Sequence, residues 1–137
     1  ESLTVVGSLA PNESADIRPE GAGLVKGIFF EEGQKVKQGD LLVKIDDSEL
    51  LAQYAQVEAR FKLAELNVAR SESLSESRTI PQSETDRARS EFSSARAELS
   101  LLRLRLQKTE VRAPFDGVIG SRSISAGDYV TTATILT

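Results

Sequence analysis

The sequence predicts an α+β fold, in which an antiparallel hairpin of two long helices is inserted into a small β-sandwich. Three observations predict it: glycines gather near the two ends of the 137-residue chain, heptad repeats fill the middle, and the two ends resemble each other. Glycine and proline break helices, so a long glycine-free segment is helical by default. No glycine occurs between Gly39 and Gly117, and the chain is therefore expected to run in the order β, α, β.

Residues 17–46 are expected to form the first half of the sandwich. Short segments of Val, Ile and Phe alternate there with Gly-Gln and Gly-Asp turns, a pattern typical of short strands joined by tight turns. Some glycines in both halves are expected to be structural, either for turns with positive φ or for a close approach of strands. These glycines are Gly33, Gly39, Gly117 and Gly127.

Residues 111–137 are expected to form the second half, because they repeat the first. Aligning Gly23 with Gly117 also brings Gly33 onto Gly127. At the same offset the alignment pairs Val36 with Val130, Leu41-Leu42 with Ile135-Leu136, and Arg18 with Arg112. A repeat of this size cannot bury its own apolar face, so the two copies are expected to pack together as one domain.

Residues 47–110 are predicted to form the helical hairpin. Apolar residues recur there at alternating steps of four and three, which is the spacing of a coiled-coil seam. The two series are Leu50, Tyr54, Val57, Phe61, Ala64 and Val68, followed by Ala88, Phe92, Ala95, Leu99, Leu102 and Leu106. Pro81 forbids one uninterrupted helix, so the tip is expected at about residues 74–82. Asp47 and Ser48 are candidate N-caps of the first helix.

The composition excludes several classes of function. A net charge of -4 and a pI near 5.0 have the wrong sign for binding a phosphate backbone, so no nucleic-acid partner is expected. The chain has neither Cys nor His, which removes thiol nucleophiles, Ser-His-Asp triads and the usual zinc ligands. We therefore predict a non-enzymatic protein with no catalytic residues, no cofactor and no metal site. No apolar run approaches the ~20 residues that a membrane helix needs.

Both ends of the chain carry a family likeness. The run GLVKGIFFEEGQKVKQGDLLVKID resembles half of a lipoyl or biotinyl carrier domain. The run TEVRAPFDGVIGSRSISAGDYVTTATIL resembles the returning half found in periplasmic adaptor subunits of tripartite efflux pumps. These adaptors are HlyD-like membrane fusion proteins, and the sequence is most similar to those of the resistance–nodulation–division (RND) type. The resemblance implies a split carrier-like β-sandwich with an inserted coiled-coil hairpin.

The resemblance also implies parts and partners beyond this fold. An outer β-barrel domain would be largely absent from this chain, and residues 1–16 would be a strand leading out of it. The partners would be an inner-membrane transporter, of the RND type, and an outer-membrane channel protein. About six copies would associate in a ring in the periplasm of a Gram-negative bacterium. Attachment to the inner membrane would use a segment not present in this chain.

A docking site at the hairpin tip is implied by the same resemblance. In the family an Arg, a Leu one helical turn later and a Ser further along contact the outer-membrane duct. Arg70 and Leu74 match the first two positions, whereas the third falls on Pro81, and Ser83 lies two residues further. A guanidinium can bind carbonyl oxygens at the end of a partner helix, and an exposed leucine supplies an apolar anchor.

Two alternatives stay open at the level of the sequence. One is a lipoyl or biotinyl carrier, for which Lys44 is the candidate lysine. The sequence around Lys44 lacks the motif of a carrier tip, and we read this residue as a solvated strand lysine. The other alternative is an adaptor of an ATP-driven exporter or of a type I secretion system, although secretion-type hairpins tend to be longer.

Overall fold

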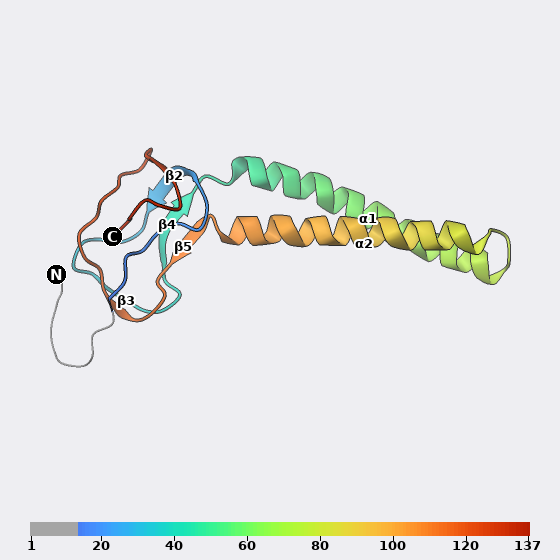
Figure 1. The fold of residues 1–137 in the computed structure, drawn as a ribbon, viewed down its shortest axis with the longest axis horizontal. Coiled ribbons are helices and arrows are strands. Elements are labelled where there is room, and N and C mark those ends of the chain that lie inside the picture. The colour runs from blue at the N-terminus through green and yellow to red at the C-terminus, as the bar shows by residue number, and fades with distance from the viewer. Residues whose placement is uncertain (1–13) are drawn as a thin grey trace. The chain divides into compact units, whose positions relative to one another are not determined.

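The computed structural model describes residues 14–137, which divide into two compact units (Figure 1). The β unit comprises the described residues up to Asp47 together with Gln107–Thr137, and the hairpin unit comprises Ser48–Leu106. Most of the strand expected over residues 1–16 lies outside the described residues, and residues 14–16 carry no strand.

The β unit contains short antiparallel strands arranged in two sheets. In the described part of the chain they are β2 (Gly23–Ile28), β3 (Lys35–Val36), β4 (Leu41–Ile45), β5 (Glu110–Arg112), β6 (Gly117–Val118) and β7 (Tyr129–Val130). The larger sheet has the order β5-β4-β2-β7, and the smaller one pairs β3 with β6. Both sheets therefore combine strands from the two halves of the sequence, as the prediction of a single closed domain requires.

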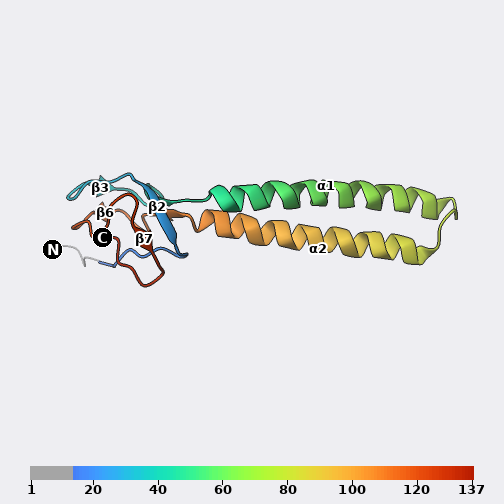
Figure 2. The same ribbon diagram turned by 90° about the horizontal axis from the view of Figure 1, so that it is seen from above.

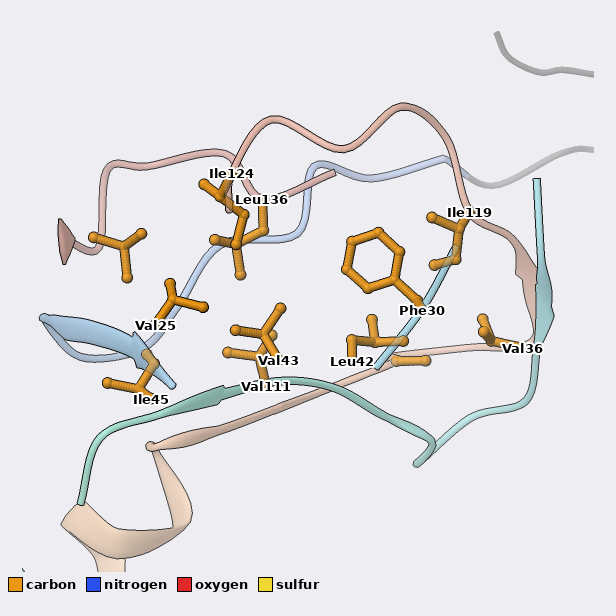
Figure 3. Close-up of a cluster of buried hydrophobic side chains, with 12 residues drawn as sticks. Val25, Phe30, Val36, Leu42, Val43, Ile45, Val111, Ile119, Ile124 and Leu136 are labelled. Carbon is orange, nitrogen blue, oxygen red and sulfur yellow. The ribbon is translucent and has the colours of Figure 1, made fainter. Parts of the chain in front are cut away.

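Apolar side chains from both halves fill the space between these strands (Figure 3). The cluster consists of Val25, Phe30, Val36, Leu42, Val43, Ile45, Val111, Ala113, Ile119, Ile124, Val130 and Leu136. Burial of this apolar surface is the main force that closes the sandwich. Because each half supplies about half of the cluster, neither half can form this core alone.

The sequence repeat becomes an approximate twofold relation in space. Val25 exchanges two backbone hydrogen bonds with residues 127–128, of 2.9 and 2.8 Å. Ile119, which lies 94 residues after Val25, exchanges the equivalent two with residues 33–34, both of 2.9 Å. The same pair of backbone hydrogen bonds thus joins the two halves at two equivalent places.

The structural glycines fall into different classes. Gly33, Gly39 and Gly127 have φ angles of 81°, 91° and 95°, in the left-handed region that side chains disfavour. Gly117 lies within β6 and is not among the residues with positive φ, so turn geometry does not explain it. Gly23 was not among the glycines expected to be structural, yet a Cβ atom there would stand 2.6 Å from Cγ2 of Ile45.

The hairpin unit consists of two antiparallel helices that lie side by side (Figure 2). Helix α1 spans Ser48–Glu76 and helix α2 spans Gln82–Gln107. The loop between them, residues 77–81, ends at Pro81. Every residue of the two expected heptad series is buried or half-buried, and the rings of Phe61 and Phe92 stack with their centroids 5.1 Å apart. The predicted α+β fold with an inserted coiled-coil hairpin is confirmed.

Candidate functional site

The tip of the hairpin is a structured turn in which hydrogen bonds close the end of α1. Arg78 has a φ of 59°, and its amide donates to the carbonyl of Ser75 at 2.9 Å. The amide of Thr79 donates to the carbonyl of Leu74 at 2.8 Å. These two bonds form a Schellman motif, which satisfies carbonyl groups that the end of a helix otherwise leaves without partners.

Side chains add a second set of bonds to the same turn. The hydroxyl of Ser77 donates to the carbonyl of Leu74 at 2.9 Å and lies 2.7 Å from the Thr79 hydroxyl. Just below the tip, Thr85 on α2 is only 1% exposed, and its hydroxyl donates to the carbonyl of Ser71 on α1 at 3.2 Å. The loop is therefore fixed both along α1 and across to α2.

The expected docking residues lie on the two helices that lead to this turn. Arg70 is exposed on α1, and its guanidinium donates to Oδ1 of Asn67 at 2.6 Å. Leu74 is half-buried, and Ser83 is exposed in the first turn of α2. Within residues 14–137, no hydrogen bond joins Arg70 and Ser83. Arg70 and Leu74 are four residues apart and share a face of α1, whereas Ser83 lies on α2.

Sequence reasoning missed Arg78, which occupies the position where helices usually end in glycine or asparagine. The nearby Pro81 is the signal that could have indicated it, because proline often follows shortly after such a helix end. The chain between Gly39 and Gly117 contains no glycine to mark the position. An arginine in the left-handed conformation is not something that propensity predicts.

Opposite charges form two rows along one face of the hairpin. Each row repeats every seventh residue, which keeps its members on one stripe of a coiled-coil helix. The rows are Glu58, Glu65 and Glu72 on α1 and Arg89, Arg96 and Arg103 on α2. Nε and Nη2 of Arg89 bind Oε2 of Glu72 at 3.2 and 2.7 Å. Arg96 has no recorded ion pair or hydrogen bond in the part of the chain that the structure describes.

Each helix also carries leucines on the face turned away from the seam. Leu63 and Leu66 on α1 are 56% and 63% exposed, and Leu101 and Leu104 on α2 are 46% and 47% exposed. Leucines three residues apart lie on the same side of a helix. The hairpin therefore presents an apolar strip on each of its two outer edges.

Small residues face outward at the same heights along the hairpin. Contacts across the seam show which residues of the two helices lie level with each other. The stacked rings of Phe61 and Phe92 lie near the α1 leucines. The 3.1 Å hydrogen bond from Arg103 to the Tyr54 hydroxyl lies near the α2 leucines. The exposed small residues are Ser90 and Ser93, level with the α1 leucines, and Ala52 and Ala55, level with the α2 leucines.

Comparison with known proteins assigns the domain. The family described as "RND MFP, barrel-sandwich hybrid domain" matches residues 13–137, almost the whole chain. The chain belongs to this family. The RND membrane fusion proteins are the family that the two half-motifs resembled, so the expected relationship is confirmed.

Individual relatives agree with this assignment. The chain is 33% identical over 135 residues to the toluene efflux pump periplasmic linker protein TtgD of Pseudomonas putida, covering 96% of this chain and 35% of the relative. It is 30% identical over 139 residues to multidrug resistance protein MdtE of Escherichia coli, covering 91% of this chain and 36% of that one. The chain thus spans about a third of the length of these curated relatives.

A solved structure resembles both units of this RND domain. It is a MacA–MexA chimeric protein containing the Pseudomonas aeruginosa MexA α-hairpin domain. The TM-score is 0.83 at 25% sequence identity, and the match covers 89% of this chain and 45% of the chimera. The helical hairpin inserted into a barrel-sandwich hybrid is therefore a shared architecture.

Lys44 was expected to be a solvated strand lysine, and the structure corrects this. Its side chain is 21% exposed, and Nζ lies 2.9 Å from Oδ2 of Asp47 and 3.9 Å from Oε2 of Glu110. Nζ also donates to the hydroxyl of Thr109 at 3.1 Å. A carrier lysine must be free to accept its cofactor, whereas Lys44 is engaged on both sides. The expected N-cap Asp47 directs its carboxylate to this lysine.

Across residues 14–137 no group of three or more Asp and Glu side chains is arranged to hold a metal ion. Neither α1 nor α2 is long and apolar enough to cross a membrane.

Proposed function

We propose that this domain belongs to a periplasmic adaptor that links an inner-membrane efflux transporter of the RND type to an outer-membrane exit duct. The observation that carries the proposal is the family match over both sandwich halves and the hairpin between them. The names of its relatives describe efflux-pump linkers and multidrug resistance proteins. In this role the domain performs no chemistry; it joins two membrane proteins and encloses the path between them.

The hairpin tip is the part that we assign to the outer-membrane channel. Arg70 is exposed and offers a guanidinium to carbonyl or carboxylate oxygens of a partner helix end. Leu74 is half-buried and offers apolar surface beside it. Ser83 is exposed across the tip and can exchange a hydrogen bond with the same partner. Pro81 stiffens the loop that separates the two helices.

The outer edges of the hairpin support self-association of neighbouring copies in a ring of about six. An α1 edge carries Leu63 and Leu66, and the α2 edge of a second copy at the same height carries Ser90 and Ser93. A large residue that meets a small one lets two helices pack closely. The α2 leucines meet Ala52 and Ala55 of the first copy in the same way, so the two edges are complementary.

The two edges differ from each other, so the contact that we propose joins the α1 edge of one copy to the α2 edge of the next. Such unlike contacts generate closed rings when the rotation closes.

The cellular setting follows from the proposed role. The adaptor would act in the periplasm of a Gram-negative bacterium, where its relatives named periplasmic linkers also belong. Attachment to the inner membrane would use a segment outside this chain.

The experiment is deletion of the gene that encodes this chain in its host. We expect the deletion strain to accumulate a fluorescent efflux substrate and to regain export when the wild-type gene is returned. The matched variants are Leu74→Asp, which places a charge in the apolar contact at the tip, and Leu24→Asp, which alters an exposed leucine of the β unit. Export should fail with the first and return with the second. Unchanged accumulation after deletion, across several classes of toxic compound, would refute the proposal.

A further inference from the structure

Arg78 is the only non-glycine with a positive φ among residues 14–137. In this conformation the Cβ atom of an L-residue crowds the following carbonyl group, a strain that glycine avoids. The position tolerates the arginine because the turn is fixed from several sides. Its amide and that of Thr79 are bonded to α1 carbonyls, and Ser77 bonds to the carbonyl of Leu74.

No interaction among the described residues explains why an arginine occupies this strained position. Arg78 is exposed, and its guanidinium has no recorded hydrogen bond or ion pair within residues 14–137. Several other arginines of the hairpin do have partners: Arg89 binds Glu72, Arg87 binds Glu91, and Arg60 binds Glu98. A cation at the end of α1 is favoured by the helix dipole, but a lysine would serve that purpose equally. A non-glycine residue kept in a strained conformation, where glycine would be easier, is a candidate for a binding role.

The turn also presents this side chain in a defined direction. The Schellman bonds fix the backbone of Arg78, and the bonded Ser77 and Thr79 hydroxyls flank it on either side. Proline three residues later restricts the loop further. Little conformational freedom of the backbone is therefore lost when the guanidinium binds a partner.

We propose that Arg78 is a further docking residue, whose guanidinium binds oxygens at the end of a helix in the partner of the hairpin tip. The inference rests on the proposed function, because it assigns this residue to the same outer-membrane channel. The carbonyl groups at the C-terminal end of a helix carry partial negative charge, and any carboxylate beside them would add to it. A planar guanidinium can bond to two such oxygens at once, which an ammonium group cannot match.

Three variants test this, with binding measured to purified outer-membrane channel proteins of the host in detergent. Arg78→Gly and Arg78→Asn keep a residue that accepts the left-handed conformation and remove the cation. Both should leave the unfolding temperature unchanged or higher and weaken binding about tenfold or more. Arg78→Lys keeps the charge at the helix end and should weaken binding by an intermediate factor. Arg87→Ala, at an exposed ion-paired arginine further from the turn, is the matched control.

The results separate this inference from the proposed function. If the wild type binds a channel and Arg78→Gly binds it equally well, Arg78 is not a docking residue although the adaptor role stands. If the wild type binds none of the host's channels and its deletion leaves efflux intact, the proposed function itself fails. If Arg78→Gly lowers the unfolding temperature together with binding, while Arg78→Asn alters neither, the role of Arg78 is structural and the inference is overturned.

Discussion

Leu42 and Leu136 occupy equivalent places in the two halves of the β unit, 94 residues apart in the sequence. Each accepts a backbone hydrogen bond at the same point of its half, from Phe29 at 2.8 Å and from Ser123 at 3.1 Å. Both leucines are almost completely buried in one cluster. Because both halves contribute to one cluster, a substitution that destabilises either half should destabilise the whole β unit.

This relation predicts that Leu42→Ala and Leu136→Ala destabilise the β unit by similar amounts. Truncating a buried leucine removes apolar contacts and leaves a cavity, at about 2–5 kcal/mol of unfolding free energy. Urea unfolding followed by a probe in the β unit measures the loss. Val118→Ala, at an exposed position, is the control and should change the free energy by less than about 0.5 kcal/mol. A large loss for only one of the two leucines would argue against a shared core.

Alanine at Gly39 should lower the stability of the β unit, whereas alanine at Gly21 should not. Gly39 has a φ of 91°, so alanine there is strained and should lower the unfolding free energy by about 1–2 kcal/mol. At Gly21 an added Cβ would meet nothing within 4 Å, and φ is not positive. Gly21→Ala should therefore be neutral or slightly stabilising. Equal effects of the two substitutions in thermal unfolding would show that backbone conformation is not the cause.

Periodic features were predictable from the sequence because they depend on regular spacing. The steps of four and three that contain Val57 and Leu99 predict a seam, and burial of an apolar stripe leaves a helix few other ways to pack. The alignment of Gly33 with Gly127 predicts two equivalent turns, and both glycines have positive φ. These signals repeat along the chain, so no single residue has to carry the inference.

Features that depend on one distant partner were not predictable. Lys44 reads as a solvated lysine because two of its partners lie far along the chain: Thr109, 65 positions away, and Glu110 at the start of β5. Arg78 reads as part of a polar loop because its conformation follows from the end of α1 and not from its own preference. The docking role of Arg70 is a prediction of the family pattern, since no property of the isolated chain depends on it.

The salt bridge of Lys44 with Asp47 should contribute measurably to stability. Both side chains are less than a third exposed, and their charged atoms lie 2.9 Å apart. We expect a coupling energy of about 1–2 kcal/mol from a double-mutant cycle with Lys44→Met and Asp47→Asn. Thermal or urea unfolding of the four proteins gives this value. A cycle with Arg87→Ala and Glu91→Ala, an exposed pair on α2, is the reference and should give less than about 0.5 kcal/mol.

Cysteine pairs test the proposed contact between hairpin edges. The natural chain has no cysteine, so Leu66→Cys combined with Ser90→Cys introduces the only thiols. The two positions lie on opposite edges of one hairpin and can form a disulfide only between copies. We expect a ladder of covalent multimers under oxidising conditions, because each copy links to two neighbours.

Single variants distinguish the possible arrangements. Leu66→Cys alone should stay monomeric on a non-reducing gel, whereas a strong dimer band would indicate that two α1 edges meet. Leu66→Cys with Leu104→Cys places the thiols at different heights and should give little cross-linking. A ladder of equal strength from this mismatched pair would argue against the proposed register.

Arg70→Asp should abolish docking at the tip without unfolding the hairpin. The residue is exposed on α1 and outside the seam, and its recorded hydrogen bond is to the neighbouring Asn67, so its replacement leaves the packing of the two helices intact. A carboxylate in place of the guanidinium would repel the partly negative end of a partner helix. Efflux should fall to the level of the deletion strain, while the helical circular dichroism signal is retained. Arg70→Lys should keep part of the activity. Full efflux with Arg70→Asp would remove this residue from the docking site and leave Leu74 and Arg78 to be tested in its place.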